Sequence, residues 1–258
     1  MDLGGELLVQ VDRFLTVLPR LSGVVLVAPV FGGRYPAQVK AGLAAALALV
    51  LMPVVPPAAA FSATVAGYLG HAVGELLVGL AVGYASLLTF AAVQVAGQLV
   101  DMEMGFGIVN VVDPYYGTQV PLVGNFLHLL ALIGFLLVDG HHVVLAALKR
   151  SFDVIPPGAA AFKGELAGLM VAMLGETFLT GVKIAAPVLG VLFVTNVSLG
   201  IVARTVPQMN VFVVGLPVKI LVGTAMLLVV LSAFSLVVKG LLGAMVEGLG
   251  QVLELLQS

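Results

Sequence analysis

Ionisable side chains inside long apolar stretches are the first candidates for chemistry in this chain. Glu176, Thr180 and Lys183 follow the spacing i, i+4, i+7, which places all three on one face of a helix. Charges next to hydrocarbon are costly without partners or water, so this face indicates an aqueous lumen or a partner subunit. Hydrogen bonds between packed helices explain the spacing equally well, and the sequence leaves both interpretations open.

Histidines near carboxylates form a second set of candidates. His71 and Glu75 are spaced i, i+4 and can contact each other on one helix, so we interpret them as a packing pair. His128 and Asp139 lie near one helical stripe if the helix between them is continuous, and the Gly140 that follows weakens that continuity. We interpret His128 and Asp139 as structural hydrogen-bonding groups, with a proton relay as the alternative.

The sequence contains no motif that indicates an enzyme active site. His141 and His142 are adjacent, so on a helix they project about 100° apart and suit a shared metal ion poorly, and the nearby Asp139 does not repair that geometry. The sequence contains no G-x-S-x-G, H-E-x-x-H or P-loop motif and no cysteine. We therefore predict a protein that is not an enzyme, with no catalytic residue, no cofactor and no metal.

The composition is that of a membrane protein. Of the 258 residues, 61% are hydrophobic and only 9% are charged, whereas charged residues make up roughly 25% of a soluble domain. So little polar surface cannot cover a water-soluble protein of this length, and the apolar surface must meet lipid or other subunits. The net charge of -2 gives no basic field for nucleic acid.

Long apolar runs predict an all-α protein made of hydrophobic helical hairpins in a single domain, residues 1–258. Several runs exceed the ~20 residues that span a bilayer core. The third run would extend for roughly 54 Å as one helix, so it must bend, split or reach beyond the membrane. The runs cover residues 14–31, 39–60, 65–100, 120–138, 166–203 and 211–246.

An acidic, glycine-rich connection, DMEMGFGIVNVVDPYYGTQVP, follows the third run at residues 101–121. Its glycines loosen the backbone, its Asp-Pro pair favours a turn, and its aromatic residues supply flat apolar bulk. Physical reasoning alone favours a loop packed on helices, with a gate that fills a pore and withdraws as the alternative. The residues that carry this pattern are Gly105, Phe106, Gly107, Asp113, Pro114, Tyr115, Tyr116 and Gly117.

A polar block separates the last two apolar runs and predicts the turn of a hairpin. Its basic residues, Arg204 and Lys219, flank the turn at Thr205–Pro217, which is typical of a cytoplasmic turn. Arg204 serves as a basic anchor or contacts a neighbouring subunit, and we favour contact because an exposed, adaptable edge follows it. The block comprises Arg204, Pro207, Gln208, Met209, Asn210 and Lys219.

Short motifs in a fixed order over nearly the whole chain resemble the FliR/SctT/SpaR family of type III secretion export-gate subunits. The strongest match lies in the last third of the chain. The matching residues are Pro29, Phe31, Pro36, Lys40, Gly97–Asp101, Met104–Phe106, Asp113-Pro114, Asp139–His142, Ser151, Pro156, Ala186-Pro187, Asn196, Gly200, Arg204, Pro207–Phe212 and Gly215–Lys219.

The resemblance implies a FliP-like portion, about residues 1–160, followed by a FliQ-like hairpin, about residues 161–258. It further implies a place in a helical export-gate cone built with FliP-like and FliQ-like subunits and wrapped by an FlhB-like subunit. Such a cone conducts unfolded flagellar proteins across the bacterial inner membrane, within the flagellar basal body, and is sealed at rest. In the family, a plug loop matches residues 105–121. The family also has a gasket of methionine residues, which belongs chiefly to the FliP subunit, so the resemblance assigns no such role to Met102 or Met104.

Two other assignments remain open at this stage. The equivalent subunit of a virulence injectisome shares the same motifs. A secondary transporter would use Glu176, Lys183, His128 and Asp139 for ion coupling, but it would also show repeated halves with broken helices, and the sequence contains no convincing repeat.

Overall fold

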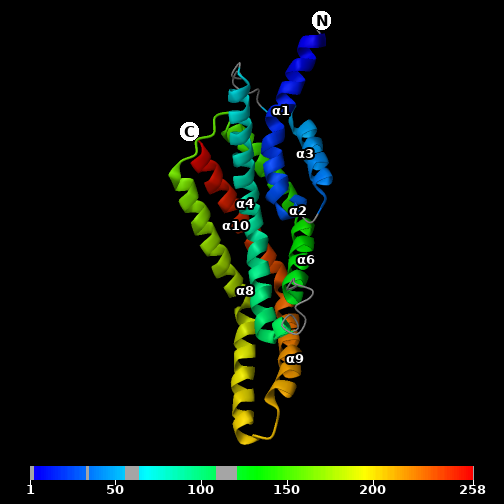
Figure 1. Cartoon of the computed structure of the whole chain (residues 1–258), viewed down its shortest axis with the longest axis vertical. Coiled ribbons are helices and arrows are strands. Elements are labelled where there is room, and N and C mark those ends of the chain that lie inside the picture. Colours follow the sequence, from blue (N-terminus) through cyan, green and yellow to red (C-terminus); the bar gives the residue numbers. More distant parts are fainter. Residues whose placement is uncertain (1–2, 33–34, 56–63, 109–120, 258) are drawn as a thin grey trace. The chain divides into compact units, whose positions relative to one another are not determined.

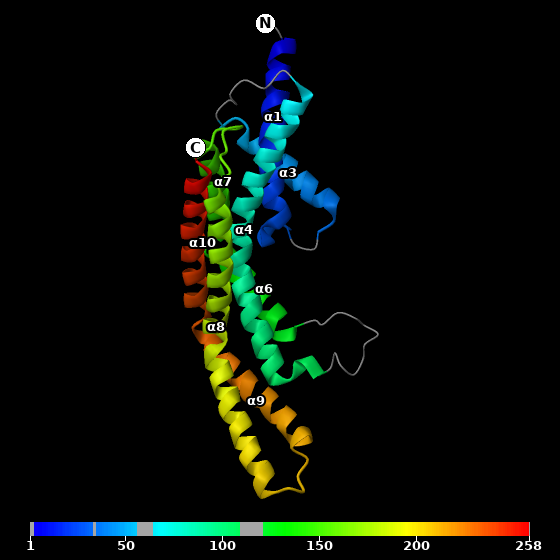
Figure 2. The same ribbon diagram turned by 60° about the vertical axis from the view of Figure 1, so that its left-hand side comes forward.

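The computed structural model describes residues 3–32, 35–55, 64–108 and 121–257, and this part of the chain is helical without any strand, as the sequence predicts. Figures 1 and 2 show the helices from two sides. The elements are α1 (Leu3–Val27), α2 (Pro29–Gly32), α3 (Ala37–Leu51), α4 (Val65–Met104), the 3-10 helix η1 (Phe106–Ile108), α6 (Leu122–Leu137), α7 (Gly140–Val154), α8 (Gly164–Thr205), α9 (Val211–Ser232) and α10 (Phe234–Leu256).

The chain forms two compact units that share its long helices. Unit 1 contains Met1–Thr89, Asp139–Leu174 and Gly243–Ser258, and unit 2 contains Phe90–Val138 and Gly175–Leu242. Helices α4, α8 and α10 therefore each contribute residues to both units. The division at about residue 160, which rests on the family resemblance, stays a prediction.

Four of the described helices are long and apolar enough to cross a membrane, namely α4, α8, α9 and α10, and α6 with α7 would make a fifth if that broken pair counts as one span. The third apolar run does not split: it lies within the single 40-residue helix α4. In α4, 61% of the most apolar window is buried within the chain, against 17% in α8 and in α9. Helix α4 is thus the most buried of these four helices, while α8 and α9 leave most of their apolar surface uncovered.

In unit 1, α1 lies along α4 with the backbones in contact. A Cβ atom added to Gly79 would meet the carbonyl oxygen of Arg20 at 1.9 Å, and one added to Gly23 would meet that of Leu76 at 2.6 Å. Only glycine fits at such distances, and small residues of this kind let apolar helices approach closely. The close approach brings the polar side chains of both helices together in the interior of the unit.

Candidate functional site

The first four residues of the acidic, glycine-rich connection, 101–104, belong to α4, so the connection between α4 and α6 begins at Gly105. Helix α4 stops at Met104, and Gly105 follows with a φ of 89°, a left-handed conformation that favours glycine. The N–H of Gly105 donates to the carbonyl oxygen of Met102 at 3.2 Å, which closes the last turn. The short helix η1 comes next, and α6 resumes the described chain after Pro121.

Asp101 joins the two ends of this connection within unit 2. Its Oδ1 accepts the N–H of Val123 and its Oδ2 accepts the N–H of Gly124, each at 2.9 Å. Asp101 is only 5% exposed, and it acts as the cap that α6 lacks, because Pro121 at the N-cap position makes no side-chain cap. A carboxylate at this position satisfies free N–H groups and complements the helix dipole. The buried hydrogen bonds of Asp101 therefore hold the end of α4 next to the start of α6. We call this pair of helix ends the base of the connection.

Two further contacts hold the same end of α4 inside unit 2. The amide of Asn196 on α8 donates to the carboxylate of Glu103. Met104, which is 1% exposed, packs on Gly223 of α9 so closely that a Cβ there would meet its Cγ at 2.8 Å. The last turn of α4 is thus tied to α6, α8 and α9 by consecutive or nearly consecutive residues.

The residues proposed to form a gate are described only in part. Gly105 and Phe106 are half-buried, and Gly107 is exposed with open space around it. The other members of that set, Asp113, Pro114, Tyr115, Tyr116 and Gly117, lie outside the described residues. The structure does describe the base of the connection, where Asp101 makes the central contacts. Asp101 was not predicted as a site residue.

The predicted polar face of α8 lies on the surface of unit 2. Glu176 and Lys183 are exposed, and Thr180 between them is half-buried. This exposure leaves the face accessible to water or to a partner, so both original interpretations remain predictions.

The polar block between the last apolar runs forms the turn between α8 and α9 (Figure 2). Asn210 caps α9, since its Oδ1 accepts the N–H groups of Phe212 at 3.1 Å and Val213 at 3.4 Å. Arg204, Pro207 and Gln208 are exposed, whereas Met209 and Lys219 are half-buried. The turn therefore presents a basic and an amide side chain, while Asn210 has a structural role that the sequence did not reveal.

A buried charge network in unit 1 involves Arg20, a residue to which sequence reasoning gave no role. Its Nε lies 2.6 Å from Oε2 of Glu75, its Nη1 donates to the carbonyl oxygen of Ser151 at 2.8 Å, and its Nη2 donates to that of Ile155 at 3.0 Å. The guanidinium also lies 4.1 Å from the centre of the Phe152 ring. Burial lowers the pKa of Arg20, and the hydrogen bond and charge of Glu75 oppose that shift.

Glu75 thus belongs to a network that extends well beyond its predicted pairing with His71. Its second oxygen, Oε1, accepts the N–H of Gly158 at 2.9 Å. Helices α1, α4 and α7 and the segment after α7 meet at these two side chains. The network is a packing device, in agreement with the structural role expected for Glu75.

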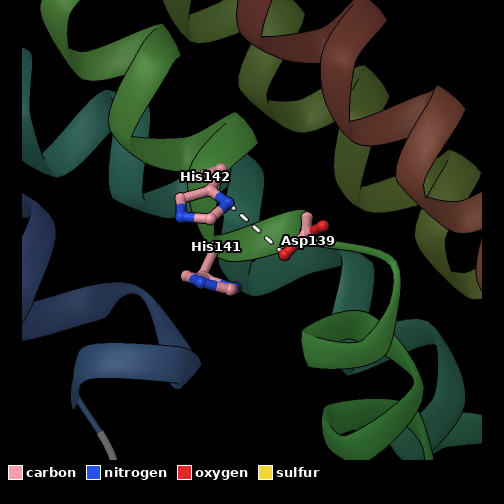
Figure 3. Close-up of side chains that lie close together, drawn as sticks. All are labelled: Asp139, His141 and His142. Carbon is pink, nitrogen blue, oxygen red and sulfur yellow. Dashed lines mark ion pairs between the residues drawn. The ribbon is translucent and has the colours of Figure 1, made fainter.

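The proposed stripe of His128 and Asp139 is interrupted, because α6 ends at Leu137 and Asp139 has a left-handed φ of 57°. His128 lies on α6 with its ring edge-on to Phe90, 5.8 Å between centroids. Asp139 instead lies at the start of α7, where its Oδ1 is 3.4 Å from Nδ1 of His142 (Figure 3). The argument that adjacent histidines point apart fails here, because the rings of His141 and His142 are 4.2 Å apart at their centroids.

Comparisons with known proteins agree over most of the chain. The model of the family described as bacterial export proteins, family 1, matches residues 11–245. The flagellar biosynthetic protein FliR of Bacillus subtilis is 39% identical over 248 residues, which cover 94% of this chain and 95% of that protein.

Two further relatives carry the same name. FliR of Pectobacterium carotovorum is 31% identical over 83% of this chain and 82% of its own length. FliR of Escherichia coli is 31% identical over 81% of this chain and 80% of its own. By its family match and these near full-length likenesses, the chain belongs to the family of bacterial export proteins that includes the flagellar biosynthetic protein FliR.

Proposed function

We propose that this protein is a non-enzymatic subunit of the flagellar protein export apparatus in the bacterial inner membrane. It would assemble with FliP-like, FliQ-like and FlhB-like subunits into a gate through which unfolded flagellar proteins pass. Family membership supports the coarse assignment, because the relatives matched over most of their length are flagellar proteins. The arrangement of the helices supports the finer one, as follows.

The uncovered apolar helices support assembly with other subunits. Large side chains on α8 and α9 remain exposed, such as Phe193 at 67%, Phe212 at 66% and Leu221 at 72%. Surface of this kind needs lipid or apolar partner helices. The polar face formed by Glu176, Thr180 and Lys183 would then meet the lumen or a neighbouring subunit, where its charges find water or partners.

The connection after α4 is our candidate for the plug that seals the gate. The single observation that carries this proposal is the closed base at Asp101, whose carboxylate holds the first N–H groups of α6 beside the end of α4. A segment anchored in this way can change its own conformation without unravelling the helices that carry it. Sealing would be steric, with Phe106, Tyr115 and Tyr116 supplying the bulk and the glycines the freedom to withdraw.

Deletion of Gly107–Gly117 tests the plug while keeping Gly105, Asp101 and the start of α6. We expect higher leakage of small solutes in cells that carry the complete export apparatus, with the deleted subunit still incorporated. A deletion that assembles normally and leaves leakage unchanged would remove the plug assignment. Loss of incorporation would be detected by co-purification of the other subunits, and substitution of the aromatic residues by serine within the intact segment would then provide the test.

A further inference from the structure

We propose that Asp139, His141 and His142 form a binding site for a divalent transition metal ion of the zinc class. Their side chains gather at the first turn of α7 (Figure 3), where one ligand atom from each lies within 4.8 Å of the others. Among the described residues, no other group of three His, Cys, Asp or Glu side chains comes together in this way. The site lies within unit 1.

The distance between the best-placed pair fits coordination of zinc. Zinc binds imidazole nitrogen and carboxylate oxygen at about 2.0–2.2 Å, so two ligand atoms of a tetrahedral site lie about 3.4 Å apart. Nδ1 of His142 and Oδ1 of Asp139 are 3.4 Å apart. These side chains are 69% and 73% exposed, so both can adjust to an ion. The His141 ring lies beside that of His142, with 4.2 Å between the ring centroids and a tilt of 36°.

The backbone at Asp139 turns its carboxylate toward the histidines. Asp139 is the only non-glycine residue with positive φ in the described part of the chain, and its side chain accepts no hydrogen bond from the start of α7. An aspartate at a helix N-cap ordinarily accepts an N–H of the first turn. His141 carries an unsatisfied group, because its Nδ1 is buried without a hydrogen-bond partner. A metal ion, or a water molecule bound to it, would supply the missing partner.

The donor set determines the class of metal. Two imidazoles and one carboxylate suit zinc, cobalt, nickel or copper, whereas magnesium and calcium prefer oxygen ligands alone. Three protein ligands leave at least one position open to water or to a group from outside. The positive end of the α7 dipole disfavours a cation, and the charge of Asp139 offsets that effect. An occupied site would connect Asp139, at the break before α7, to the first turn of that helix.

Titration of the full-length chain in detergent, prepared without a histidine tag, tests the site with Co²⁺ and Zn²⁺ as probes. We expect uptake of one equivalent of Co²⁺ with the absorption of a nitrogen- and oxygen-ligated ion, displacement by Zn²⁺, and no competition by Mg²⁺. Both His142→Ala and Asp139→Asn should weaken binding by about tenfold or more. Asparagine tolerates the left-handed conformation, so the second variant keeps the backbone.

The matched control is Asp153→Asn, which changes an exposed carboxylate on the same helix. It should leave the affinity for Co²⁺ unchanged. The proposal is overturned if the wild-type chain takes up no metal at micromolar concentrations, or if His142→Ala binds as tightly as the wild type. It is equally overturned if Asp153→Asn and Asp139→Asn weaken binding alike, because the uptake would then report surface charge alone.

Discussion

Arg20 and Glu75 form a buried ion pair that joins α1 to α4 within unit 1, with 2.6 Å between Nε and Oε2. Both side chains are almost fully buried, at 0% and 2% exposure, and the remaining donors and acceptors of the pair bind backbone groups around Ser151, Ile155 and Gly158. A buried charge is costly alone and tolerated when every polar atom has a partner. The two residues therefore stabilise the unit only as a pair.

Removing one member of this pair should be more harmful than removing both. For Glu75→Ala we expect the free energy of unfolding to fall by roughly 3–5 kcal/mol, because Arg20 would stay buried without a counter-charge. The double variant Arg20→Met with Glu75→Gln should recover a large part of that loss. Thermal unfolding of the detergent-solubilised chain measures both, and Glu254→Ala, at an exposed carboxylate, should shift stability by no more than about 0.5 kcal/mol. Equal losses in Glu75→Ala and Glu254→Ala would contradict the pairing.

Asp101 should control the local stability of the start of α6. Asp101→Ala leaves the N–H groups of Val123 and Gly124 without acceptors, so the first turn should open more readily by about 2 kcal/mol. Asp101→Asn keeps one acceptor oxygen and should cost about half as much. Hydrogen exchange at the start of α6 measures the effect directly, with the amides of α7 as an internal reference. Unchanged exchange in Asp101→Ala would show that the cap does not hold the base of the connection.

Residue patterns predicted the helices well where apolar runs were bounded by turn residues. The run at 120–138 became α6, and the polar block became the turn before α9. The run at 211–246 gave no indication of a break, yet the structure divides it at Ala233, between α9 and α10. Neither a proline nor a glycine stands at that break. Nothing in the periodicity of a continuous apolar run marks such a point.

The polar contacts were harder to predict because their partners are distant in sequence. Arg20 and Glu75 are 55 positions apart, and Asp101 is 22 and 23 positions from the N–H groups that it caps. Helical spacing identifies neighbours three or four residues apart, and so it paired Glu75 with His71 alone. The close approach of His141 and His142 was also missed. It occurs at the first turn of α7, directly after Asp139, whose left-handed φ the sequence pattern did not predict.

Two close helix contacts in unit 2 should respond differently to an added methyl group. In Gly97→Ala the new Cβ would lie 2.3 Å from the Cα of Gly124, so two backbones must separate. In Gly223→Ala it would meet the flexible side chain of Met104 at 2.8 Å, which can rotate away. We expect a loss of stability of about 3 kcal/mol or more for the first variant and about 1 kcal/mol for the second.

Gly200→Ala is the matched control for these substitutions, because no atom lies within 4 Å of the added Cβ. A helical alanine there should stabilise the chain by about 0.5–1 kcal/mol. The midpoint of thermal unfolding ranks the variants. If Gly97→Ala proved no worse than Gly223→Ala, the backbone contact between α4 and α6 would not limit the packing of unit 2.

The turn between α8 and α9 should serve contact with another subunit through Arg204 and Gln208, which are exposed. Replacing both by alanine should reduce co-purification with the other export subunits and lower swimming motility, while the stability of the isolated chain stays within about 0.5 kcal/mol. Asn210 must be treated separately, because Asn210→Ala removes the cap of α9 and costs about 1 kcal/mol by itself. Asn210→Ser keeps a capping oxygen and removes only the amide, so it isolates the contact from the cap. Normal motility and assembly in the Arg204→Ala, Gln208→Ala double variant would leave Arg204 as a basic anchor at the membrane edge and nothing more.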